Sequence, residues 1–184
     1  MNFFELVNKR ESCRAYTEQP VEQEKLMSCI EAARLAPSAC NSQPWRFVLV
    51  NEQEKVTALA HLLQDKITGL NKFAYDAPAF IVVVEGVAKL SASLGGKVKD
   101  QHYAAIDLGI ATEHICLAAT EQGIGTCIMG WFDEKAIKKL FNIPVGRRVR
   151  LVIAFGYSKY PEARKKARKE MQEIVSFNKW GEIE

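Results

Sequence analysis

One stretch of the sequence limits the possible folds more than any other: residues 102–123, HYAAIDLGIATEHICLAATEQG. It is long enough for a helix of about 20 residues, which Gly123 would end. Apolar residues occupy most of its faces, so a stable fold must bury it nearly all round. A small sheet in a chain of 184 residues offers little material for this. We therefore expect an obligate homodimer in which this helix packs against its symmetry mate. The alternative is burial within a single chain.

Four short apolar segments are predicted to be strands. They lie at residues 45–50, 79–84, 124–129 and 149–155. Three of them are nearly continuous apolar runs, which is typical of strands with helices on both faces. The predicted fold class is α+β, with a mixed, mainly antiparallel sheet flanked by helices and a long central helix at the dimer interface.

Further helices are predicted before the first strand, at residues 2–6 and 20–36, and between the strands, at residues 54–67 and 133–141. Asn2 stands three residues before Glu5, which is the spacing of a capping box. The apolar pattern of the third helix runs as far as Ile67, and Asp133 is placed to cap the last one. Residues 87–101 have no such pattern and are expected to form a loop.

The composition is that of a soluble globular protein, with 48% apolar and 26% charged residues. We expect a single domain over residues 1–184. It has no run of about 18 apolar residues, so we expect no membrane association and a cytoplasmic location. The net charge of +3 is too small to indicate nucleic-acid binding. The five cysteines form no C-x-x-C pair and the three histidines are far apart, so no metal site is predicted.

The segment KRESCR at residues 9–14 surrounds a hydroxyl with basic side chains. Arg10 and Arg14 flank Ser12, and guanidinium groups bind phosphate in a bidentate manner. These residue types therefore suit a phosphate site. The alternative for this segment alone is a solvated basic loop.

A second basic segment lies near the end of the chain. Residues 159–169 hold six of the 25 lysines and arginines. Lys166 and Arg168 are two residues apart, so in an extended chain they point to the same side. If this segment converges on residues 9–14, the two would form a dianion site. The alternatives are a solvated tail or a weak nucleic-acid patch, although interleaved aromatic residues are missing.

A polar loop precedes the first strand. The segment APSACNSQPW at residues 36–45 holds four small polar side chains between two prolines. Proline fixes its own φ and restricts the residue before it, so the shape of this loop is strongly constrained. Neither a dinucleotide fingerprint nor a P-loop follows the strand.

Four segments resemble the FMN-dependent nitroreductase family in their order and spacing. They are RESCRAY (10–16), APSACNSQPWRFVLV (36–50), IDLGIATEHICLAATEQGIGTCIMGWFDEKAIKKLFNIP (106–144) and LVIAFGY (151–157). The resemblance covers nearly the whole chain. It implies an α+β homodimer with two FMN sites at the subunit interface, and a C-terminal arm, residues 157–184, packed on the partner subunit.

The resemblance also assigns the site residues. The implied cofactor-binding residues are Arg10, Glu11, Ser12, Arg14, Pro37, Ser38, Ala39, Asn41, Cys127, Ile128, Met129, Gly130, Lys166 and Arg168. Arg10, Ser12 and the Lys166–Arg168 pair would hold the phosphate, while the polar loop would reach the flavin of the partner subunit. The Gly130 N–H would face flavin N5, and Arg14 would face its N1–O2 edge. Glu11 departs from the family pattern, and its side chain is expected to point outward while its N–H serves the phosphate.

The implied activity is hydride transfer from NADH or NADPH to nitroaromatics, quinones or similar acceptors, by a ping-pong mechanism. The flavin carries the hydride, so no catalytic side chain is predicted. Cys40 and Cys127 are expected to be loop or packing residues. The alternatives are a specialised relative, such as a dehalogenase, an azole-forming dehydrogenase or a flavin-degrading enzyme, and a non-catalytic flavin-binding redox sensor.

Overall fold

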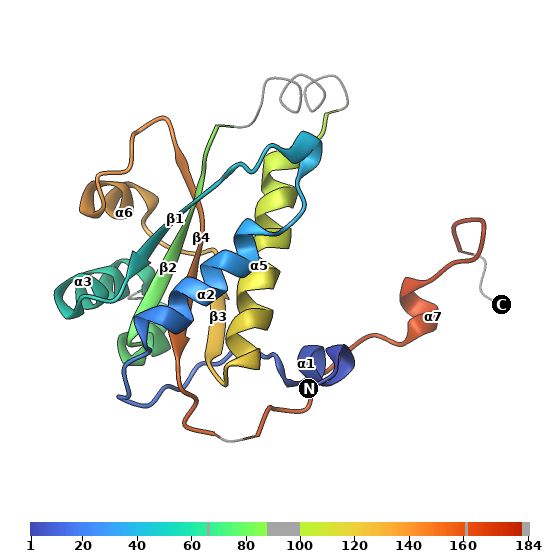
Figure 1. Ribbon diagram of the computed structural model, residues 1–184, viewed down its shortest axis with the longest axis horizontal. Helices are drawn as coiled ribbons and strands as arrows, with labels where there is room; N and C mark the ends of the chain where they lie inside the picture. The colour runs from blue at the N-terminus through green and yellow to red at the C-terminus, as the bar shows by residue number, and fades with distance from the viewer. Residues whose placement is uncertain (66, 88–99, 161, 182–184) are drawn as a thin grey trace.

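An antiparallel sheet of four strands forms the centre of the molecule (Figure 1). The computed structural model describes residues 1–65, 67–87, 100–160 and 162–181. The strands are β1 (Trp45–Val50), β2 (Ala79–Glu85), β3 (Gly125–Met129) and β4 (Arg148–Gly156), in the spatial order β1-β2-β4-β3. All three strand pairs are antiparallel, and an isolated bridge between Ser12 and Thr126 is parallel. The four predicted strands are confirmed to within one residue at each end.

Helices cover both faces of the sheet, as the apolar strands predicted (Figure 1). Helices α2 (Gln23–Arg34) and α5 (Tyr103–Glu121) cover one face, and α3 (Gln53–Leu63) and α6 (Glu134–Leu140) cover the other. Successive side chains of β2 enter the two hydrophobic cores in turn: Phe80 belongs to one and Ile81 to the other. Because a strand alternates its side chains, a strand buried on both faces must be apolar throughout.

The two predicted helix caps are confirmed, and the helix predicted at 20–36 begins at Gln23. In α1 (Phe3–Lys9), Asn2 and Glu5 form a reciprocal capping box. The Asp133 side chain accepts a hydrogen bond from the N–H of Ala136 at the start of α6.

The predicted extent of the 54–67 helix is wrong. Helix α3 ends at Leu63, and Ile67 is 95% exposed instead of joining the apolar face. The Asp65 carboxylate accepts a hydrogen bond from the N–H of Ile67 at 2.8 Å. A short acidic side chain that binds the backbone two residues later favours a turn over a helix.

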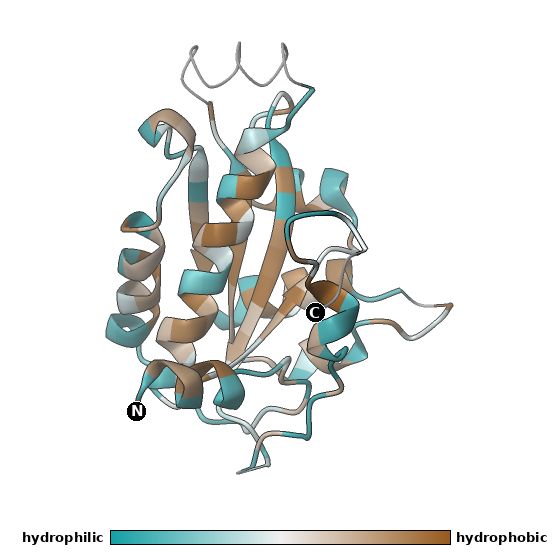
Figure 2. Cartoon of the chain, turned by 90° about the vertical axis from the view of Figure 1, so that its right-hand side faces the viewer, coloured by the Kyte–Doolittle hydropathy of each residue, from teal (hydrophilic) through white to brown (hydrophobic). Residues whose placement is uncertain are grey.

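Helix α5 is not buried all round within one chain. Its inner face packs against α2 and the sheet. Its outer face includes Ile106, which is 51% exposed, and the exposed Gly109, with Ile110 and Leu117 half-buried along the same side. Figure 2 shows hydrophobic segments interleaved with hydrophilic ones along this helix. No helix in the described part of the chain is both long and apolar enough to cross a membrane.

Two further turns and the chain end complete the fold. The 3-10 turns are η1 (Ala39–Asn41) and η2 (Lys72–Asp76), and α7 (Met171–Ile174) lies in the C-terminal arm. The arm leaves the body of the molecule beside α1 and extends away from it (Figure 1). Most of the predicted loop at 87–101 lies outside the described residues.

Candidate functional site

The segment that follows α1 is fixed along the edge strand β3. The N–H of Cys13 donates to the carbonyl of Thr126 at 2.8 Å, and Ser12 forms the parallel bridge with Thr126. A Cβ at Gly125 would lie 2.8 Å from the Cβ of Cys13, so only glycine allows this close approach. Tyr16 is buried, and its hydroxyl donates a hydrogen bond to the carbonyl of Cys13, which holds the segment against the core. Arg10, Ser12 and Arg14 therefore have fixed positions beside β3.

The second basic segment runs over the first, as required for a dianion site. The Arg164 guanidinium donates to the Glu11 carboxylate at 2.9 Å and to the carbonyl of Ser12 at 2.8 Å. The Lys166 ammonium donates to the carbonyl of Val7 in α1. Residues separated by about 150 positions in the sequence thus form one site.

These side chains line a cavity of about 300 Å³, the basic pocket. Its lining residues are Arg10, Glu11, Ser12, Arg14, Arg164, Lys165, Lys166 and Arg168. Burial, together with the positive charges of Arg10 and Arg168, lowers the pKa of Lys166 below its ordinary value. Six cations line the pocket beside Glu11, and Glu113 pairs with Arg10 at 3.6 Å, so the site keeps positive charge that a dianionic group would neutralise. The donor set therefore fits a phosphate monoester.

The predicted outward orientation of Glu11 is wrong. Its carboxylate accepts hydrogen bonds from both the backbone N–H and the side chain of Arg164. The Glu11 side chain is only 18% exposed. Arg164 was missed by the sequence reasoning, because nothing in the local pattern sets it apart from the other basic residues of the arm.

At the end of β3, every second residue is accessible from outside the fold. Cys127 and Met129 are buried, whereas Ile128 is 41% exposed and Gly130 is exposed with open space around its Cα. A ligand beside this strand can therefore reach Ile128 and the backbone, but not the side chains of Cys127 and Met129. Burial raises the pKa of the Cys127 thiol, although the nearby Arg14 opposes this shift. A buried, protonated thiol is a packing residue, as expected.

The polar loop has an unusual backbone. Cys40, Asn41 and Gln43 all have positive φ values, of 53°, 49° and 48°. Such conformations are costly outside glycine, and they often mark functional segments. The loop is held by its own side chains: Ser38 Oγ accepts from the N–H of Gln43, and Asn41 Oδ1 accepts from Gln43 Nε2, both at 2.9 Å.

Asp107 anchors this loop and was missed by the sequence reasoning. It is a buried acid in the otherwise apolar α5, and its Oδ1 accepts a hydrogen bond from the N–H of Ala39 at 3.0 Å. The signal that could have revealed it is an acid within an apolar helix, since a buried charge needs a partner.

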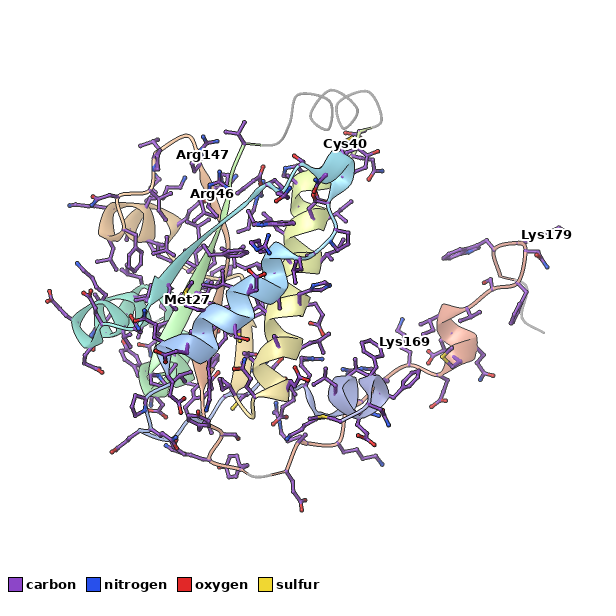
Figure 3. The ribbon with its side chains drawn as sticks, in the orientation of Figure 1. Met27, Cys40, Arg46, Arg147, Lys169 and Lys179 are labelled. Carbon is purple, nitrogen blue, oxygen red and sulfur yellow. The ribbon has the colours of Figure 1, made fainter. Side chains whose placement is uncertain are left out.

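The structure brings together three of the four predicted groups of site residues. Residues 10–14 line the basic pocket together with Lys166 and Arg168, and Arg14 lies near Cys127 of β3, but the loop at Pro37–Asn41 is not among these neighbours. Figure 3 shows Cys40 at one end of α5 and Lys169, which follows Arg168, in the arm beside α1 at the other. Within one chain, the loop and the basic pocket do not meet.

A family model described as the nitroreductase family matches residues 7–157. The chain is 31% identical to a Streptococcus pyogenes protein whose name assigns it to the NAD(P)H nitroreductases, over 86% of this chain and 90% of that protein. It is 26% identical to an iodotyrosine deiodinase of Thermotoga neapolitana, over 95% of this chain and 97% of that enzyme.

Solved structures have the same fold. An FMN-dependent nitroreductase from Clostridium difficile R20291 is 28% identical, with a TM-score of 0.76 over 97% of this chain and 100% of that chain. A nitroreductase family protein from Streptococcus pneumoniae TIGR4 is 27% identical, with a TM-score of 0.80 over 96% of this chain and 100% of that chain.

Proposed function

The chain belongs to the nitroreductase family, and we propose that it is an FMN-dependent oxidoreductase that takes hydride from NADH or NADPH and reduces nitroaromatics, quinones or similar acceptors. The observation that carries this proposal is the basic pocket, whose residues 10–14 run beside β3. Arg10, Ser12, Lys166 and Arg168 would hold the phosphate of FMN there, through charge-assisted hydrogen bonds.

When bound, FMN would supply the hydride-transfer chemistry at its N5 atom. The protein's own residues would position the flavin and set the electrostatic field around its ring. Arg14 brings a fixed positive charge to the edge of β3, where it would stabilise negative charge that develops on the ring. Gly130 brings an exposed backbone N–H to the same edge, with no side chain in the way. The hydride donor and the hydride acceptor would bind at this edge of β3 one after the other.

We also propose a homodimer that completes the site. The polar loop and the basic pocket lie at opposite ends of α5, so the loop would serve the flavin of the partner subunit. The outer face of α5 supplies an apolar surface for the contact between subunits. The C-terminal arm would pack on the partner, because its large apolar side chains are exposed here: Met171, Ile174, Phe177 and Trp180. An arm of this kind gains stability only by burying those side chains.

The first test is the identity of the cofactor. The purified protein should carry flavin, which acid should release completely as FMN. The reason is that the basic pocket accommodates a terminal phosphate. Chromatography of the acid supernatant measures this. FAD in the supernatant, or flavin retained on the denatured chain, would contradict the proposal.

A second measurement tests the order of the reaction. Initial rates of NADH or NADPH oxidation with menadione should give parallel lines in double-reciprocal plots, since one site would serve donor and acceptor in turn. Intersecting lines would show that both bind together.

A second candidate function is reductive dehalogenation, which the likeness to the Thermotoga neapolitana deiodinase favours. Iodide release from iodotyrosine by the reduced protein separates the two. A dehalogenase should release iodide efficiently and oxidise NADH or NADPH with menadione slowly, whereas the proposed reductase should do the reverse.

A further inference from the structure

We propose that Glu11 is a positioning residue for the cofactor phosphate: by holding Arg164, it fixes the arm over the basic pocket before FMN arrives. This inference rests on the proposed function, because it takes the basic pocket to be the phosphate site. An acid beside a phosphate would normally weaken binding by repulsion. The contacts of Glu11 point to the opposite effect.

Glu11 and Arg164 are joined by several hydrogen bonds. The Glu11 carboxylate accepts the Arg164 backbone N–H at 3.3 Å and the Arg164 Nε at 2.9 Å. The same guanidinium continues to the carbonyl of Ser12. Arg164 is therefore tied at three points to the segment that carries Arg10 and Ser12. Its backbone position in turn sets the path of Lys166, two residues later.

The basic pocket carries an excess of positive charge. Six cationic side chains line the basic pocket, and Glu11 is the only acid among the described residues that line it. The charges of Arg10 and Arg168 act on Lys166 strongly enough to help lower its pKa. Without FMN, this repulsion would drive the arm away from residues 10–14. Glu113, which pairs with Arg10, and Glu11 both oppose it, and of the two Glu11 does so through direct contacts with Arg164 of the arm.

Glu11 and Arg164 differ in their exposure to solvent. The Glu11 side chain is 18% exposed, whereas that of Arg164 is 64% exposed. Glu11 is thus the more buried partner of the pair, on a segment anchored to β3, whereas most of the Arg164 side chain faces solvent. A largely buried acid that holds the exposed basic arm in place lowers the ordering cost of binding, because the phosphate then meets Lys166 and Arg168 already in position.

The test is FMN binding by the apoprotein, followed by quenching of flavin fluorescence. Glu11→Gln should weaken FMN binding about threefold to tenfold, the range for one partly exposed charge-assisted pair. Arg164→Gln should do the same, and the double variant should be no weaker than either single one. Exchanging the charges, with Glu11→Arg and Arg164→Glu together, should restore part of the affinity.

Two comparisons make the test specific. Riboflavin lacks the phosphate, so its affinity should not change in Glu11→Gln. Glu162→Gln is the matched control, because it removes the same charge near Arg164 but takes no part in these contacts. It should leave FMN binding equal to or slightly tighter than that of the wild type.

Three results would overturn the proposal: FMN binding that is unchanged or tighter in Glu11→Gln, an equal loss of FMN and riboflavin, or additive effects of the two single variants. Arg164→Gln keeps the test valid if Glu11→Gln fails to fold. A wild-type protein that binds FMN no better than riboflavin would instead refute the phosphate site itself, and with it the proposed function.

Discussion

At the scale of single residues, the site depends on close packing beneath it. Gly156, at the end of β4, lies against the buried Tyr16, whose hydroxyl secures the residue before Arg14. A Cβ at Gly156 would lie 2.6 Å from the Tyr16 ring and 2.8 Å from Pro78. Neither neighbour is the end of a flexible side chain, so the backbone or the ring would have to move.

Gly156→Ala should therefore lower the free energy of unfolding by about 1–3 kcal/mol, the usual cost of overpacking. Gly146→Ala is the matched control, because an added Cβ there meets nothing within 4 Å. It should change stability by less than about 0.5 kcal/mol. Urea unfolding at one protein concentration measures both. Equal stability of the two variants would show that Tyr16 yields without cost.

At the scale of elements, Glu134 joins helix α6 to strand β4. Its carboxylate accepts from Arg148 Nε at 3.0 Å and from the N–H of Val149 at 2.9 Å, and it pairs with Lys138 at 3.0 Å. Burial works to raise the pKa of Glu134. The hydrogen bonds from Arg148, Lys138 and Val149 outweigh it and lower the pKa from 4.5 to about 2.

A lowered pKa in the folded state means that the ionised carboxylate stabilises the fold. Its contribution is complete above the unfolded pKa of 4.5 and is lost as the pH falls towards about 2. At pH 7, Glu134→Gln should lower the free energy of unfolding by about 1–2 kcal/mol. This is less than the full shift would give, because Arg148 is more than half exposed.

The difference between the wild type and Glu134→Gln should narrow between pH 4.5 and pH 3, as followed by urea unfolding. Glu31→Gln is the control, because Glu31 pairs with Arg34 within one exposed helical turn and joins no two elements. Its effect at pH 7 should be smaller. A Glu134→Gln difference that stays constant with pH would mean that the carboxylate charge is not what joins α6 to β4.

At the scale of the whole molecule, the question is where the polar loop acts. Asp107 holds this loop near the start of α5, and the basic pocket lies farther along the helix, where Arg10 pairs with Glu113. A single chain therefore separates the two parts of the proposed site. In a symmetric dimer, each loop would complete the site of its partner.

Mixed dimers test this arrangement. One inactive parent combines Arg10→Ala with Arg168→Ala, which removes charge-assisted bonds worth roughly 1.5–3 kcal/mol each. The other combines Ser38→Leu with Asn41→Leu, which blocks the loop. A mixed dimer has both defects in one site and none in the other, so refolding the parents together should restore about a quarter of the sites. Flavin content and NADH oxidation measure this. An inactive mixture with proven heterodimers would show that the loop serves its own chain or no flavin at all.

The sequence by itself determined where the four strands and the main helices lie, and that helices cover both faces of the sheet. Periodicity is a local property: alternating burial makes β2 apolar at every position, and the spacing of Asn2 and Glu5 specifies a cap within one turn. The same reasoning predicted too long a helix for α3. The helical spacing of apolar residues continues to Ile67, but the hydrogen bond from the Ile67 N–H to the Asp65 carboxylate favours a turn there. The basic segments and the polar loop could also be recognised in the sequence, because their residue types are unusual for simple connecting loops.

Only the tertiary structure decided which of these pieces meet. The contact between Glu11 and Arg164 joins residues with no common local signal, and it reversed the expected orientation of an acid. The bond from Ala39 to Asp107 likewise depends on how α5 packs under the loop. Such contacts depend on packing and charge across the whole fold, whereas sequence patterns report each segment's own burial. That is why the basic segments and the polar loop could be recognised in advance, whereas Arg164, Asp107 and the contacts they make could not.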